Sequence, residues 1–125
     1  MTEKNDLAFI EHILDSIKAI KEFSRGIRKV ELISSRLKQS AIVREIEIIG
    51  EAVKNLSEQL KSKYKDIEWQ EIAGTRDKMI HHYFGVDLNI VWNIIKKDLP
   101  ALKKKIKGIK EELTRQGRGD LFGHL

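Results

Sequence analysis

The sequence predicts an all-α protein, folded as an antiparallel, up-and-down bundle of about four or five helices. One proline and eight glycines interrupt the 125 residues, so long stretches lack the residues that break helices. Apolar side chains recur every three or four positions, and the strict alternation that is typical of half-buried strands is nearly absent. No internal repeat or linker divides the chain, which is therefore expected to form one domain.

The first half of the chain is expected to form two long helical regions. Residues 5–25 carry an apolar stripe, and Gly26 follows as a residue that readily adopts a left-handed cap. Residues 29–62 form the second region, with a break near Ser34 and Ser35, whose hydroxyls can cap a new start. The stripe of the first helix comprises Leu7, Ile10, Leu14, Ile17 and Ile20.

The second half is expected to begin with a loop at residues 61–66 and a third helix over residues 69–84. Gly85, Val86 and Asp87 would then form a turn, in which Asp87 caps a helix over residues 88–97. A last helix begins at residues 98–100, because proline is accepted in the first turn. Residues 1–114 thus make up the helical domain, and residues 115–125, with three glycines, are expected to be a flexible tail.

The width of the apolar faces predicts a homodimer. The segment AIVREIEIIGEAVKNL, residues 41–56, is apolar on more than one side. A single bundle core does not need a face of that width. Burial of the remaining apolar surface against a second copy would account for it.

Composition excludes several classes of protein. No apolar run is long enough to span a bilayer, and the N-terminal segment lacks the apolar core of a signal peptide. The absence of cysteine excludes disulfides and thiolate zinc sites and fits a reducing compartment, so a cytoplasmic protein without membrane contact is expected. The net charge of +5 points weakly to an anionic partner such as nucleic acid.

Scarce titratable side chains gather in GTRDKMIHHYFG, residues 74–85. On a continuous helix, Arg76 would share a face with Ile72, Met79, Ile80 and Tyr83. A charge on such an apolar stripe must be paired or must open onto a water-filled groove. One interpretation is a structural salt bridge, for which the candidate partners are Glu45, Glu47 and Glu51.

The two adjacent histidines differ in their helical neighbours. His81 follows Asp77 by four residues, so the carboxylate could orient one ring nitrogen and leave the other free to exchange a proton. His82 follows Lys78, which offers no such orientation. His81 is therefore the better acid–base candidate, although both histidines could be ordinary surface residues.

A straight helix cannot direct Arg76, His81 and Tyr83 at one atom, because these side chains point in different directions. Either the helix bends, or a groove between two copies collects the side chains. Tyr83 could equally be a packed aromatic with a satisfied hydroxyl. No metal site or cofactor is expected, since the metal-binding motifs H-E-x-x-H and D-x-D are absent and adjacent histidines diverge on a helix.

The order Arg76, four residues, His81, one residue, Tyr83 resembles the R-x4-H-x-Y signature of the HepT-like branch of the HEPN superfamily. The flanking segments EIIGEAVKNLS, W-x-x-I-A-G and YFGVDLNIVWNIIKKDLPALKKKI are also similar to that family. The resemblance covers about residues 5–113, and the motif with these flanks is specific. It implies a helical homodimer that is commonly the toxin of a toxin–antitoxin pair and acts as a metal-independent ribonuclease.

The same resemblance implies roles for individual residues. Arg76 and His81 would be the catalytic pair, with Asp77 in a supporting position. Tyr83 matches the tyrosine to which a minimal nucleotidyltransferase antitoxin can add AMP, which inactivates the toxin. The implied partners are RNA, that antitoxin and a second copy of the chain. The alternatives are a non-catalytic helical subunit that helps a separate nucleotidyltransferase bind nucleotide or substrate, and a structural bundle in which the cluster is incidental.

The residue types suit RNA cleavage without a metal. The reaction needs a base for the ribose 2′-OH, an acid for the departing 5′-oxygen and a cation for the phosphate. Histidine exchanges protons near neutral pH and typically contributes about 10²–10⁴-fold, while arginine grips two phosphate oxygens. Two copies of His81 across a dimer groove would supply both the acid and the base. DNA lacks the 2′-OH and should not be cut.

Overall fold

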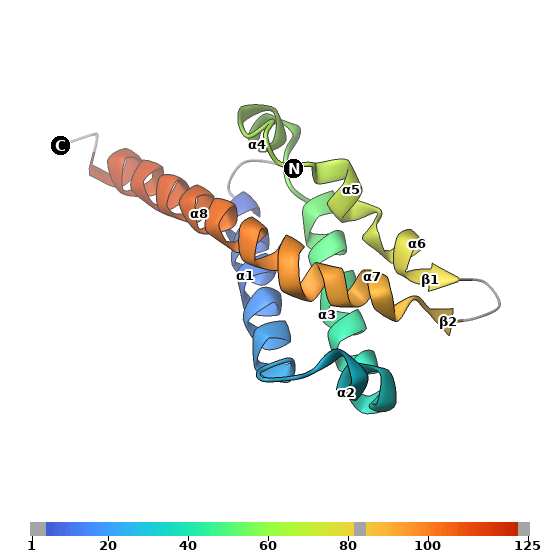
Figure 1. The fold of residues 1–125 in the computed structure, drawn as a ribbon. Coiled ribbons are helices and arrows are strands. Elements are labelled where there is room, and N and C mark those ends of the chain that lie inside the picture. The colour runs from blue at the N-terminus through green and yellow to red at the C-terminus, as the bar shows by residue number, and fades with distance from the viewer. Residues whose placement is uncertain (1–4, 82–84, 123–125) are drawn as a thin grey trace.

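The computed structural model describes the backbone of residues 5–81 and 85–122 and the side chains of residues 5–80 and 85–117. It confirms the all-α class, with one short two-stranded ribbon added (Figure 1). The helices are α1 (Asp6–Phe23), α2 (Lys29–Ser34), α3 (Arg36–Lys54), α4 (Glu58–Lys63), α5 (Trp69–Ala73), α6 (Thr75–Met79), α7 (Leu88–Asn93) and α8 (Leu99–Phe122). A π-helical segment, η2 (Ile94–Asp98), joins α7 to α8, and β1 (Ile80–His81) pairs antiparallel with β2 (Gly85–Val86).

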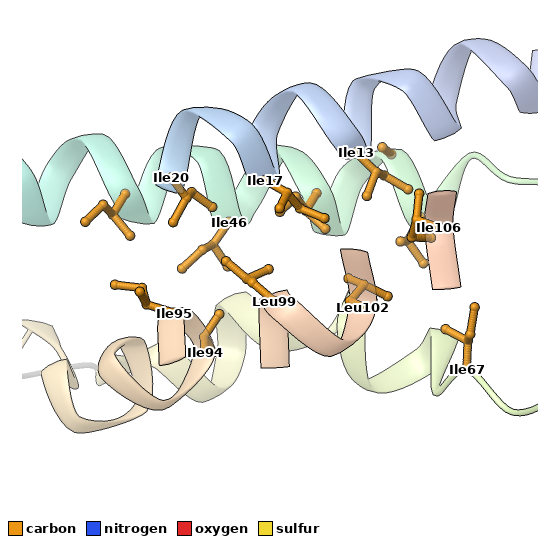
Figure 2. Close-up of a cluster of buried hydrophobic side chains, with 14 of the residues drawn as sticks. Ile13, Ile17, Ile20, Ile46, Ile67, Ile94, Ile95, Leu99, Leu102 and Ile106 are labelled. Atoms are coloured by element: carbon orange, nitrogen blue, oxygen red, sulfur yellow. The ribbon is translucent and has the colours of Figure 1, made fainter. Parts of the chain in front are cut away.

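The core lies between α1, α3 and the continuous rod formed by α7, η2 and α8. α1 packs along α3, and the rod crosses both helices, while α5 and α6 lie against α3 (Figure 1). Isoleucine and leucine side chains from all three sides of this core are buried together. Figure 2 shows a part of this cluster, in which the labelled residues are Ile13, Ile17, Ile20, Ile46, Ile67, Ile94, Ile95, Leu99, Leu102 and Ile106.

Two of the predicted breaks in the first half are confirmed. Gly26 follows α1 with a φ of 67°, which is the left-handed region that favours glycine. The Ser35 hydroxyl accepts a hydrogen bond of 3.2 Å from the backbone N–H of Lys38 and so caps the start of α3.

The region expected over residues 29–62 is interrupted a second time, after Lys54. The Ser57 hydroxyl accepts from the Leu60 N–H at 3.1 Å and starts α4, which runs into the segment expected to be a loop. Ser57 is in turn held by the buried Asp6, whose carboxylate accepts from the Ser57 N–H at 2.8 Å and from its hydroxyl at 2.6 Å. This contact ties the beginning of α1 to the α3–α4 connection.

The continuous helix predicted over residues 69–84 is wrong. It breaks at Gly74 and ends at Met79, after which Ile80 is extended, with φ −102° and ψ 121°. The Met79 carbonyl accepts a hydrogen bond of 2.6 Å from the N–H of Asp87, so it is not used for a further helical turn. The chain instead forms the β1–β2 ribbon, in which His81 pairs with Gly85. Gly85, with a φ of 76°, and Val86 therefore belong to a strand, not to the predicted turn.

Asp87 caps α7 as predicted, since its carboxylate accepts from the N–H groups of Asn89 and Ile90 at 3.0 and 3.3 Å. The separate helices expected before and after residue 98 are one continuous rod. Proline has no N–H and its ring clashes with the carbonyl four residues back, here that of Lys96. A wider π turn before Pro100 accommodates this conflict, and the Leu99 N–H donates to the Ile94 carbonyl.

α8 extends to Phe122, so residues 115–122 are helical where a flexible tail was expected. The division of the chain at residue 114 stays a prediction. Within the described part of the chain, no helix is both long enough and apolar enough to cross a lipid bilayer.

Candidate functional site

Arg76 lies on the exposed side of α6, with 64% of its side chain accessible. Its Nε donates a hydrogen bond of 2.9 Å to Oε2 of Glu47 on α3, whose side chain is 27% accessible. The placement of Arg76 on a buried apolar stripe was therefore wrong. The reason is that α6 is a single turn, separated from α5 by Gly74, so the two helices do not share one continuous face. Of the three carboxylates considered as partners, Glu47 forms the ion pair.

Gly50 sets the approach of α5 to α3. A Cβ at Gly50 would lie 3.4 Å from the carbonyl oxygens of both Ala73 and Ile72, so a larger side chain would meet backbone. Glu47 precedes Gly50 by three residues and thus lies on the same side of α3. The close contact at Gly50 and Ala73 accordingly brings Arg76, three residues further on, opposite Glu47.

The other motif residues are divided between two elements and the adjoining segment. Asp77 is exposed on α6, and its N–H donates to the Gly74 carbonyl at 3.1 Å. His81 lies on β1, so it is not one helical turn from Asp77, and the helical spacing that predicted their hydrogen bond is absent. The His81 side chain and all of His82 and Tyr83 lie outside the described residues.

A groove of about 480 Å³ opens beside Arg76, between α1, α3 and the α5–α6 segment. The charged and aromatic side chains that α1 and α3 contribute lie three or four residues apart, so within each helix they share one face. Sequence reasoning named Arg76 and, as its candidate partners, Glu47 and Glu51. It missed the other residues of the groove, since nothing local indicates which faces of α1 and α3 meet α6. The charged and aromatic residues that line it are Phe9, His12, Arg44, Glu47, Glu51, Lys54 and Arg76.

The cations of this groove differ in their partners. Arg76 is paired with Glu47, and Lys54 lies 3.9 Å from a carboxylate oxygen of Glu51. Arg44 is exposed and has no ion-pair partner among the side chains that the structure describes. The groove therefore presents one guanidinium that is oriented by a carboxylate and another that is available to an anion.

A second cavity, of about 520 Å³, lies between α5–α6 and the η2–α8 segment, and its lining includes neither Arg76 nor Asp77. Glu68 and Glu71 stand at its rim. The hydrogen bond that protonated Glu68 donates to Glu71, followed by the repulsion between the two charges, raises the pKa of Glu68. Lys78 lies 3.9 Å from Glu71 at the same rim. In the described residues, no group of three or more His, Cys, Asp or Glu side chains is placed to hold a metal ion.

Comparison with known proteins gives relatives across nearly the whole chain. A Methanocaldococcus jannaschii protein named "Gamma-glutamylcyclotransferase and putative RNase" is 45% identical over 107 residues, which cover 86% of this chain and 48% of that protein. This chain therefore spans about half the length of that relative. A "Putative RNase" of Caldanaerobacter subterraneus subsp. tengcongensis is 42% identical over 106 residues, covering 85% of this chain and 95% of the relative.

A "Probable ribonuclease HepT" of Thermococcus cleftensis is 40% identical over 103 residues, covering 82% of this chain and 94% of the relative. No solved structure matches the chain significantly. The model of one protein family, described as ribonuclease HepT-like, matches residues 13–109. This agrees with the resemblance drawn from the motif and its flanks, and the chain belongs to the ribonuclease HepT-like family.

Proposed function

We propose that the protein is a metal-independent endoribonuclease whose reaction is carried by Arg76 and His81. The observation that carries the proposal is the position of Arg76, which is accessible at the edge of a groove and oriented by Glu47. An accessible guanidinium stays charged and can bind two oxygens of a phosphate. Membership of the family and the names of the relatives supply the reaction class.

In the proposed reaction, one His81 imidazole takes the proton of a ribose 2′-OH, and the 2′-oxygen attacks the adjacent phosphorus. The bond from phosphorus to the 5′-oxygen breaks, and a second imidazolium gives that oxygen its proton. The products are a 2′,3′-cyclic phosphate and a free 5′-OH. Arg76 stays charged throughout and neutralises the charge that gathers on the phosphate oxygens. Asp77 supports the site from α6.

The need for two imidazoles leads to the second part of the proposal, a homodimer in which each copy contributes one His81. Four large apolar side chains on the outside of the bundle support it: Phe23, Val30, Ile33 and Leu37. Leu37 is 81% accessible and Val30 58%, which is costly for a protein that remains a monomer. A second copy would cover these side chains.

The third part of the proposal is regulation by a minimal nucleotidyltransferase antitoxin, for which the protein would be the toxin in the cytoplasm. Transfer of AMP to Tyr83 would place a bulky nucleotide and a negative phosphate seven positions after Arg76. That phosphate would compete with RNA for the Arg76 guanidinium, because an added negative group can pair with a nearby arginine, as in phosphorylation. A protein modified on Tyr83 that still cleaves RNA at the full rate would rule out this regulation.

The test is cleavage of RNA by the purified protein in the presence of EDTA. Arg76→Ala and His81→Ala should each lose cleavage by about 10²-fold or more while keeping the helical circular dichroism spectrum. Arg28→Ala is the matched control, because Arg28 is also an exposed arginine in an ion pair, with Glu31 at 2.6 Å, but lies outside the groove. Cleavage that survives either of the first two substitutions, or that requires a divalent metal, would refute the proposal.

A further inference from the structure

We infer that the groove beside Arg76 binds single-stranded RNA, with the His12 ring as the platform on which a base stacks and Arg44 as the contact for a phosphate. The inference rests on the proposed function in taking RNA as the ligand. It adds two residues, from α1 and α3, that lie outside the R-x4-H-x-Y motif. Both line the same groove as Arg76.

His12 is an exposed imidazole whose orientation is fixed by a neighbouring ring. Its centroid lies 6.0 Å from that of Phe9, with the two planes at 89°, an edge-to-face arrangement. Phe9 is half-buried and packs against the hydrophobic core, so it acts as the brace, and His12 is the outer ring. A braced and accessible aromatic ring in a groove can stack on a nucleobase with little loss of side-chain entropy.

Arg44 lies on α3, one turn before Glu47 and thus on the same side of that helix as the carboxylate that holds Arg76. It is exposed and has no ion-pair partner among the described residues. A phosphate could therefore pair with Arg44 without breaking an existing contact. A planar guanidinium is well suited to two phosphate oxygens.

The combination of an accessible ring with cations favours a single strand over a duplex. In a duplex the bases are stacked on each other and cannot reach a side-chain ring, whereas unpaired bases stack readily on aromatic residues. Grooves that bind single strands without strong sequence preference combine such platforms with positive charges along the backbone. This groove has both features, and we expect it to hold a base next to the phosphate that Arg76 contacts.

The first experiment measures binding, by fluorescence anisotropy, of a labelled RNA strand carrying 2′-O-methyl groups throughout. This strand has no 2′-OH and cannot be cleaved, so binding is separated from the reaction. His12→Ala should weaken binding by about 5- to 150-fold, the range typical for loss of one base-stacking contact. His12→Phe should bind within about twofold of the unchanged protein, because stacking needs the ring and not its nitrogens.

Phe9→Leu tests the brace, because it keeps an apolar side chain against the core but removes the ring that orients His12. It should weaken binding in the same direction as His12→Ala. Tyr64→Leu is the matched control, since Tyr64 is also a half-buried aromatic packed against the core but does not line the groove. Equal effects of Phe9→Leu and Tyr64→Leu would count against the stacking platform.

Arg44 is tested through the salt dependence of binding. Arg44→Gln should reduce the slope of log affinity against log salt concentration by about 0.7, the change expected for one lost phosphate contact on a single strand. Arg36→Gln is the control, since Arg36 is an exposed arginine of the same helix outside the groove, and it should leave the slope unchanged.

The results distinguish this inference from the proposed function. If RNA is cleaved normally but His12→Ala and Arg44→Gln bind the methylated strand like the unchanged protein, the inference is overturned and the ribonuclease proposal stands. If the protein cleaves no RNA but these variants lose binding, the inference stands alone. Equal affinity for duplex RNA, or a changed molecular mass of His12→Ala in light scattering, would also overturn it.

Discussion

At the scale of single residues, the contact between Glu47 and Arg76 decides how the guanidinium meets RNA. Glu47 orients Arg76 through Nε and also places a negative charge in the groove. Glu47→Gln keeps a hydrogen-bond acceptor but removes that charge, so we expect RNA affinity to rise by up to about fivefold at low salt, as for other exposed ion pairs. Glu47→Ala also loses the orientation, so its kcat should fall while its RNA affinity does not.

The kinetics of both Glu47 variants give the separate values of kcat and KM that check this prediction. Glu51→Gln is the matched control, because Glu51 lines the same groove but lies 3.9 Å from Lys54 and is not paired with Arg76. If all three variants change KM alike and leave kcat unchanged, Glu47 contributes only charge and does not position Arg76.

Glu68 and Glu71 give a second prediction at this scale, for the pH dependence of the second cavity's rim. The hydrogen bond between the two side chains, together with their mutual repulsion, raises the pKa of Glu68. A raised carboxyl pKa means that the folded state binds the proton more tightly, so its stabilising contribution is present at low pH and is lost as pH rises through the raised pKa.

The measurement is an NMR titration of the side-chain carboxyl carbons. The pKa of Glu68 should lie above its ordinary value and should return towards it in Glu71→Gln. Glu31 serves as the internal control, because its hydrogen bond with Arg28 lowers its pKa and should be unaffected by that substitution. A Glu68 pKa that does not respond to Glu71→Gln would contradict the contact.

At the scale of elements, substitutions at two helical glycines can test how α5 packs against α3. A Cβ at Gly108 in α8 meets nothing within 4 Å, so Gly108→Ala should stabilise the protein by about 1 kcal/mol through helix propensity alone. At Gly50 the Cβ of an alanine would be in van der Waals contact with the carbonyl oxygens 3.4 Å away, so Gly50→Ala should be tolerated. Gly50→Leu should cost about 1–3 kcal/mol, because the larger side chain pushes α5 and α6 from α3.

Thermal unfolding of the three variants checks this order, and RNA cleavage adds a second readout. Gly50→Leu should lose activity along with stability, because displaced α6 no longer brings Arg76 to Glu47. Gly108→Ala should keep full activity. If Gly50→Leu unfolds at the same temperature as Gly50→Ala, the close approach at Gly50 does not determine the position of α5 on α3.

The elements also show which features a sequence can predict. The breaks at Gly26 and Ser35 and the cap at Asp87 depend on one residue and its immediate neighbours, and all three were predicted. The end of α6 depends on the hydrogen bond from the Asp87 N–H to the Met79 carbonyl. These residues are eight positions apart, and the periodicity of apolar residues does not predict such a contact. The π segment before Pro100 was missed because packing of η2 and α8 in the core holds the rod together across the proline.

The candidate site divides in the same way. The motif identified Arg76, and Glu47 was one of three candidate partners within one helical region. Reasoning from the sequence therefore nearly predicted this ion pair. His12 and Arg44 reach the groove only because α1 and α3 pack side by side, which is decided by the tertiary fold. A residue's role can thus be predicted from the sequence when it depends on neighbours along the chain. It cannot be predicted in this way when it depends on how helices pack.

At the scale of the whole molecule, the proposed reaction demands two imidazoles, and one chain supplies a single His81. The exposed apolar side chains Val30 and Ile33 lie about one turn apart on α2, Leu37 lies at the start of α3, and Phe23 ends α1. A monomer would leave this surface in water, at a cost proportional to its apolar area. Association through it would reconcile the chemistry of the site with the surface of the bundle.

Light scattering at micromolar concentration should therefore give twice the chain mass of 14.5 kDa. The double substitution Ile33→Glu and Leu37→Glu should give the single-chain mass, because two like charges on the apolar face would have to be buried without partners. It should also abolish RNA cleavage while the helical spectrum stays unchanged. Gln70→Glu, which adds a charge at an exposed position of α5, should remain dimeric and active. A monomeric unchanged protein that cleaves RNA, or a monomeric variant that cleaves RNA at the full rate, would show that one chain suffices, and the second proton donor would then have to be found within it.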